Sequence, residues 1–306
     1  MLGADRLSRI PEHVRTLAII KANLRDLFFS HREGAKIRVK EVITNRTELE
    51  PPVINDWLQI TDEELSQLKM YLRKVANHVK DLGPAEELKY LNAQASFEDH
   101  LMIMHEYMDV LISIPAFKKF LEENGISENF LHALVETHDA GRRVFNGKLS
   151  LLYVDGVSDG LIKANYSNYP KNYSHSIWWI IDNLQAPDME NGREIDIDMI
   201  SVPHKVGLVL KTIDTNGKFD DDGQLIDPES NFSPGGRHER WIANQVASNR
   251  LPFYIKGEQI VTPEQYAAND RRLTEKGAQV IESLTGLSFA EIRNQVAARL
   301  AKLSLA

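Results

Sequence analysis

Residues 96–139 read SFEDHLMIMHEYMDVLISIPAFKKFLEENGISENFLHALVETHD. Ser96 marks a helix start, and the apolar residues after it recur three and four positions apart until Pro115 interrupts them. A short helix from Pro115 is expected to close at the dipeptide 124–125, Asn-Gly, and another to begin at Ser127. The stretch therefore predicts consecutive helices joined by short turns, with a His-Asp pair at their end.

The same helical signals occur on both sides of this stretch. Thr61 and Glu64 have the spacing of a capping box, and Ser288 and Glu291 repeat it near the end of the chain. Further helices are expected at about 65–82, 175–184, 203–214, 240–248, 263–284 and 288–303. Alternating apolar residues, typical of strands, are confined to 36–47 and 253–261. We therefore predict an all-α fold with at most a small β-hairpin.

The amino-acid composition limits which partners and which metal ligands are expected. The chain has 306 residues and a net charge of −8, from 36 Lys and Arg against 44 Asp and Glu, so nucleic acid is not the expected partner. It contains no Cys, which leaves His and carboxylates as ligands for any metal ion. The longest apolar runs fall far short of the roughly 20 residues that span a bilayer, so we expect a cytoplasmic protein that does not enter the membrane.

Four residues, far apart in the sequence, are candidate metal ligands. His138 and Asp139 are adjacent at a predicted helix end, and His100 lies on the apolar face at the start of an earlier helix. Asp214 ends the apolar stripe of a later helix, where a buried carboxylate needs a cation or a hydrogen-bond donor. Two imidazoles and two carboxylates suit one divalent ion, namely Mn, Fe, Co, Ni, Zn or Mg. Composition does not select among these metals.

The order His, His-Asp, Asp on successive helices resembles the HD-domain superfamily of metal-dependent phosphohydrolases. The matching stretches are 96–100, 136–142 and 208–218. This resemblance implies that His100, His138, Asp139 and Asp214 bind the metal and that residues 96–220 form an HD-like helical bundle. Residues 1–95 and 221–306 are then helical extensions at the two ends.

The same resemblance implies a hydrolase that acts on a phosphate ester of a nucleotide or another small phosphorylated metabolite. In that family the ion lowers the pKa of a bound water, which attacks phosphorus. Arg142 and Lys218 would offset negative charge on the phosphate, and His175 would serve as an acid or base. Each of these three also fits an ordinary surface or helix-start position. His105 and His204 are not expected to be ligands, because helical geometry points the first elsewhere and places the second about 15 Å from Asp214.

Two other functions remain open from the sequence. An HD-type oxygenase would need two irons and more His ligands than the spacing supplies, and a non-catalytic sensor would bind a nucleotide without turnover. Three tyrosines at 166, 169 and 173 and the pair Trp178-Trp179 fit either stacking on a base or packing in a core or lid. The amphipathic helices at the chain ends could form a homodimer.

Overall fold

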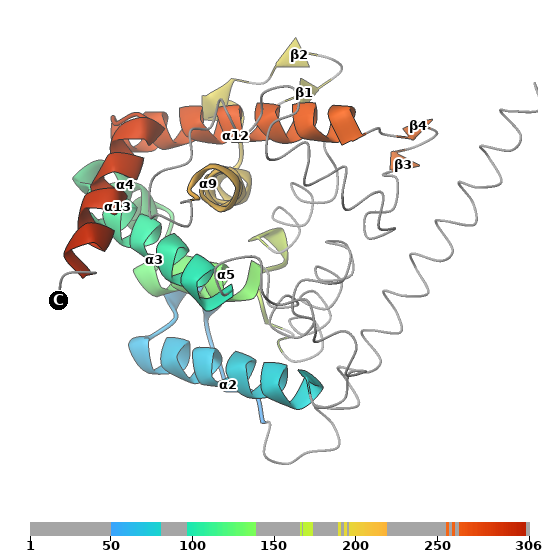
Figure 1. The fold of residues 1–306 in the computed structure, drawn as a ribbon. Coiled ribbons are helices and arrows are strands. Elements are labelled where there is room, and N and C mark those ends of the chain that lie inside the picture. Colours follow the sequence, from blue (N-terminus) through green and yellow to red (C-terminus); the bar gives the residue numbers. More distant parts are fainter. Residues whose placement is uncertain are drawn as a thin grey trace, which may run out of the picture.

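The structure is a computed structural model that describes residues 50–80, 97–138, 166, 168–173, 189–190, 193–194, 196–218, 255–256, 259–260 and 263–303. Within these ranges the fold is all-α, as predicted (Figure 1). Strands occur there only as two antiparallel hairpins of two-residue strands, β1 (Met189–Glu190) with β2 (Arg193–Glu194) and β3 (Ile255–Lys256) with β4 (Gln259–Ile260). The second hairpin confirms the strand prediction at 253–261. The predictions at 36–47, 175–184 and 240–248 lie outside the described residues.

The helices begin and end close to the predicted positions. Two single turns of 3₁₀ helix accompany them. The elements are η3 (Trp57–Gln59), α2 (Asp62–Lys80), α3 (Phe97–Ser113), α4 (Pro115–Glu123), α5 (Glu128–His138), η5 (Ile197–Met199), α9 (Val202–Asn216), α12 (Pro263–Thr285) and α13 (Phe289–Leu303).

Local hydrogen bonds explain these boundaries. The Thr61 backbone N–H donates to Glu64 Oε2 at 2.9 Å while the Glu64 N–H donates to Thr61 Oγ1, which completes the predicted capping box of α2. Ser288 and Glu291 cap α13 in the same way. Gly125, with φ at 65°, lies directly after the end of α4, in a backbone conformation that costs glycine little.

Helix α5 lies in the interior of the bundle. Of its nine residues from Phe130 to His138, all except His132 are buried. Helices α2 and α3 pack against α5, while α9 packs against α3 and, on its other side, against α12. Figure 1 shows α9 nearly end-on between α12 and the pair α3 and α5. The three helices that carry predicted ligands are therefore neighbours.

A close crossing of α9 and α12 fixes the position of α9. A Cβ atom on Gly277 of α12 would collide with Thr212 Oγ1 and would lie 2.5 Å from the backbone oxygen of Leu208. Beside this contact, Lys211 Nζ lies 3.2 Å from Asp270 Oδ2 in an ion pair that is almost fully buried. The absence of a side chain at Gly277 lets the helices approach, and the ion pair fixes their register.

No helix within the described residues is both long enough and apolar enough to cross a bilayer. The longest, α12, has 23 residues, but charged side chains are spread along it.

Candidate metal centre

Asp214 and His100 meet although 114 positions separate them in the chain. His100 lies in the first turn of α3, and Asp214 lies in the last turn of α9. The His100 Nε2 atom is 3.2 Å from Asp214 Oδ1, and the two side chains are 17% and 19% exposed. The next residue of α3, Leu101, and the preceding residue of α9, Ile213, are buried core residues, so the imidazole and the carboxylate meet beside the apolar core.

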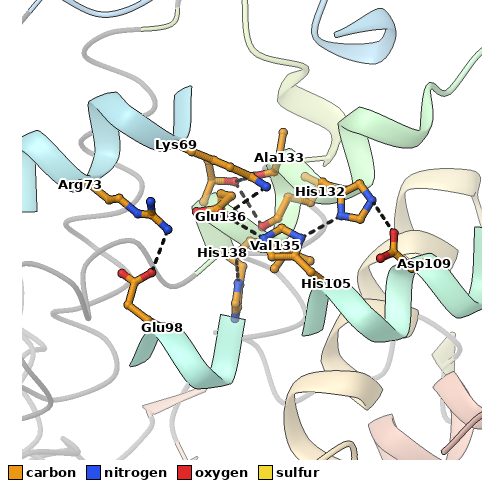
Figure 2. Close-up of polar contacts among 12 residues, drawn as sticks. Lys69, Arg73, Glu98, His105, Asp109, His132, Ala133, Val135, Glu136 and His138 are labelled. Atoms are coloured by element: carbon orange, nitrogen blue, oxygen red, sulfur yellow. Dashed lines mark hydrogen bonds and ion pairs between the residues drawn. The ribbon is translucent and has the colours of Figure 1, made fainter. Parts of the chain in front are cut away.

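His138, the last residue of α5, completes the group. Its ring centroid lies 5.9 Å from that of His100, and the residue is 7% exposed. His138 Nδ1 is 2.7 Å from the Val135 carbonyl oxygen. Because a carbonyl only accepts, Nδ1 carries the hydrogen, and Nε2 of the neutral ring is then the basic nitrogen. Figure 2 shows the ring extending from α5 toward α3.

One ligand atom from each of His100, His138 and Asp214 lies within 4.8 Å of the others. Metal to ligand distances of about 2.0–2.2 Å place neighbouring ligand atoms about 3.0–3.5 Å apart. The separation of 3.2 Å between His100 and Asp214 falls in that range. The fixed tautomer of His138 is a further feature of metal sites, where a ligating imidazole donates its other N–H to a carbonyl or carboxylate. These three residues, which we call the metal centre, could hold a divalent ion.

The other predicted site residues fall in different places. Asp139, Arg142 and His175 lie outside the described residues. Lys218 is half-buried and follows the end of α9, four residues after Asp214. His204 lies in the first turn of α9, with Nδ1 2.7 Å from Ser201 Oγ, and takes no part in the metal centre, as predicted.

Beside the metal centre lies a second group of histidines that the sequence analysis missed. His105 of α3 contacts His132 of α5 through their Nδ1 atoms at 2.8 Å, and its Nε2 is 2.8 Å from Glu136 Oε1. His132 Nε2 is in turn 3.3 Å from Asp109 Oδ1. We call these four residues the imidazole chain (Figure 2). His105 does point away from His100, as its position on the helix predicted.

The imidazole chain is embedded in protein. Glu136 is 4% exposed at its side chain and also lies 3.8 Å from Lys69 Nζ of α2. The pKa of His132 is lowered to about 4, chiefly by burial and then by the neighbouring charge of His105, while the charge of Asp109 opposes the shift. The signal in the sequence was Glu136, a carboxylate that directly follows the apolar run 133–135 and lies one turn after His132.

The three tyrosines considered for base stacking are core residues. Tyr166 and Tyr169 pack edge-on against Trp57, with ring centroids 4.8 and 4.6 Å away, and Tyr173 packs edge-on against Phe130. Their exposed fractions are 5–6%. Protein side chains therefore cover these rings, which favours the packing interpretation. Trp178 and Trp179 lie outside the described residues.

No family model, curated protein or solved structure matches the chain. The functional assignment therefore depends on the geometry of the metal centre. Two imidazoles and a carboxylate from three helices form a mixed nitrogen and oxygen ligand set, which suits first-row divalent ions better than calcium.

Proposed function

We propose that the protein is a metal-dependent phosphohydrolase of the HD type, which acts on a phosphate ester of a nucleotide or another small phosphorylated metabolite. One observation carries this proposal: His100, His138 and Asp214, spread over more than a hundred residues, converge within 4.8 Å. They do so in the order and on the kind of helices that the sequence resemblance implied. Convergence of residues so far apart is not required by packing alone, since buried polar groups are costly.

The residues of the chain prepare the site for a cation. The Val135 carbonyl holds the His138 ring in the tautomer with basic Nε2, and Asp214 supplies negative charge in a largely buried position. In this proposal Asp139, which follows His138 directly, is the fourth ligand. A divalent ion held there would supply Lewis acidity, which polarises a phosphoryl oxygen and makes water more acidic.

Cationic side chains near the metal centre are proposed to bind the phosphate. Lys218 follows Asp214 by four residues, just after the end of α9, and is half-buried, so its ammonium group could reach a phosphoryl oxygen beside the centre. Arg142 follows His138 by four residues and is proposed to do the same with its planar guanidinium group. His175 is proposed to act as an acid or base toward the substrate or water.

The first test is the metal itself. The purified protein, stripped with a chelator, is titrated with Mn, Fe, Co, Ni, Zn and Mg ions, and binding is measured by calorimetry. We expect one tight site per chain for at least one of these ions, and Asp139→Ala should abolish it. A protein that binds none of them would refute the proposal.

The second test is turnover. The metal-loaded protein is screened for phosphate release from nucleoside mono-, di- and triphosphates and from sugar phosphates. Release that disappears in Asp139→Ala but persists in His204→Ala supports the hydrolase, since His204 lies outside the metal centre. Iron binding with oxygen consumption would indicate an oxygenase instead, and tight nucleotide binding without release would indicate a sensor.

A further inference from the structure

The imidazole chain joins helices α3 and α5 through three consecutive contacts. These run from Glu136 to His105 at 2.8 Å, from His105 to His132 at 2.8 Å, and from His132 to Asp109 at 3.3 Å. Each histidine uses both of its ring nitrogens, one toward the other histidine and one toward a carboxylate. The arrangement is linear, so it has no central point at which an ion could bind all four groups.

The contacts of the imidazole chain need more hydrogens than two neutral histidines can supply. The two contacts at 2.8 Å each need one hydrogen to be hydrogen bonds, and the contact of His132 with Asp109 at 3.3 Å needs one on His132 Nε2 to be an ion pair, whereas ionised carboxylates bring none. Two neutral imidazoles bring only two hydrogens. With two, one contact would place two lone pairs face to face at about the length of a hydrogen bond, which is repulsive. A third proton leaves both contacts at 2.8 Å as hydrogen bonds and makes His132 and Asp109 an ion pair.

We infer that His105 and His132 hold one extra proton between them in the folded protein, as a singly charged imidazole pair that ties α3 to α5. The pair lies between the carboxylates of Glu136 and Asp109, which stabilise one positive charge. Repulsion between adjacent imidazolium rings opposes a second. The pair is thus a pH-sensitive clamp between the two helices that carry His100 and His138.

The charged groups around the pair come from five helices. Glu106 and Asp109 belong to α3 and contact Arg299 of α13. Among the described residues, these groups are Lys69 from α2, Glu106 and Asp109 from α3, Lys118 from α4, Glu128 and Glu136 from α5, and Arg299 from α13. Four carboxylates face three cations, so the surroundings carry a net negative charge that favours one proton on the pair.

The lowered pKa of His132, about 4, agrees with resistance to a second proton. In the unfolded chain each histidine would titrate near pH 6.5. Between about pH 4 and 6 the unfolded chain therefore binds two protons at these positions and the folded protein binds one. Above pH 7 the unfolded chain binds none, while the folded protein still holds one.

This difference gives the sign of the pH dependence. The folding equilibrium constant changes tenfold per pH unit for each proton by which the two states differ. The pair should therefore lower the folding equilibrium constant by up to tenfold per pH unit as the pH falls from 6 toward 4. The pair should also lower this constant by up to tenfold per pH unit as the pH rises above 7, until the pair loses its proton. The contribution of the pair is greatest near pH 6.5.

The test compares urea unfolding of the wild type with that of the double variant His105→Gln/His132→Asn at several pH values from 4.5 to 8.5. Subtracting the two curves isolates the pair. We expect the difference in unfolding free energy between the wild type and the variant to be greatest near pH 6.5. On each side of that pH it should fall with the slope that corresponds to one bound proton. If the folded pair is neutral, the difference should rise with pH below pH 6 with the slope of two protons and be flat above pH 7. If the two histidines are independent, the difference should be flat at every pH. Either result would overturn the inference.

A second measurement does not depend on the double variant folding. Nitrogen-15 NMR of the histidine rings in the wild type at pH 7.5 should show one ring pair with three bound hydrogens, and His132→Asn should remove that signature. Two neutral rings at this pH would contradict the shared proton. His204→Gln is the control, because its ring contacts Ser201 locally and its loss should leave the signature unchanged. Both measurements are made without metal or substrate, so they are independent of the proposed hydrolase activity.

Discussion

The metal centre and the imidazole chain both take their histidines from the same two helices, α3 and α5, but they arrange their atoms differently. In the metal centre each side chain directs one atom toward a common region within 4.8 Å. In the imidazole chain each ring contacts partners on opposite edges, so its nitrogens point along a line. The direction of the ligand atoms, more than the number of histidines, decides which group suits an ion and which suits a proton.

Removal of the buried carboxylate of the imidazole chain should have the largest effect. Glu136→Ala leaves His105 and Lys69 without their shared partner in a site where the carboxylate is 4% exposed. Breaking a buried charge pair in this way costs about 3–5 kcal/mol of folding free energy. Urea unfolding at pH 6.5 measures the loss.

Lys118→Ala is the matched control for Glu136→Ala. Lys118 also pairs with a glutamate of α5, Glu128, at 2.8 Å, but both side chains are about half exposed. Solvent screens such a pair, so no measurable change in unfolding is expected. Equal losses in the two variants would show that burial does not distinguish the imidazole chain from a surface ion pair.

Of the histidines in the two groups, only those of the metal centre should affect metal affinity. His138→Ala removes one of three described ligands, and we expect its metal dissociation constant to rise by about 100-fold or more. His132→Ala makes the same change six residues earlier on α5 and should leave that constant within about threefold, if measured where both variants are folded. Calorimetric titration of each variant gives the two constants. Comparable losses would mean that the two groups of histidines form one site.

Gly277→Ala should perturb the metal centre while leaving the imidazole chain intact. The added Cβ would force α12 away from the backbone of α9, which carries Asp214, at a cost of about 1–3 kcal/mol. Metal affinity should fall severalfold because Asp214 moves relative to His100, whereas the pKa of His132 should stay near 4.

Gly286→Ala is the control that separates the movement of α9 in Gly277→Ala from a general loss of stability. Gly286 has φ at 74° and open space around its Cα, so an alanine there strains the backbone by about 1 kcal/mol without pushing on α9. Its metal affinity should match that of the wild type. A fall in affinity equal to that of Gly277→Ala would indicate that general destabilisation, and not the position of α9, weakens the site.

The helices were predictable because their signals are local. The capping boxes at Thr61 and Ser288, and the stop at Pro115, each depend on residues within one turn, and the structure has the helix boundaries there. The convergence of His100, His138 and Asp214 was predictable only through the order of a known motif. The sequence contains no local signal that brings α9 beside α3.

The imidazole chain was missed for a physical reason. Its members lie on different helices, and contact between His105 and His132 depends on how α3 rotates against α5, which no periodicity specifies. The β1 and β2 strands escaped prediction because two residues are too short to show alternation. Glu136 was the available clue, since a carboxylate on the buried part of a helix must find partners.

The smallest expected effect concerns Lys69, and it measures how strongly the imidazole chain responds to charge. Lys69 is one-third exposed and its ammonium group lowers the pKa of His132, after burial and the charge of His105. Lys69→Met removes that charge but keeps the stem, so the pKa of His132 should rise from about 4 by a fraction of a unit. The control is Lys119→Met, whose ion pair with Glu123 lies within α4 and is largely exposed. NMR titration of the His132 ring reports the shift in both variants. A fall in this pKa in Lys69→Met would contradict the sign of the interaction, because loss of a neighbouring cation can only make a second positive charge easier to hold.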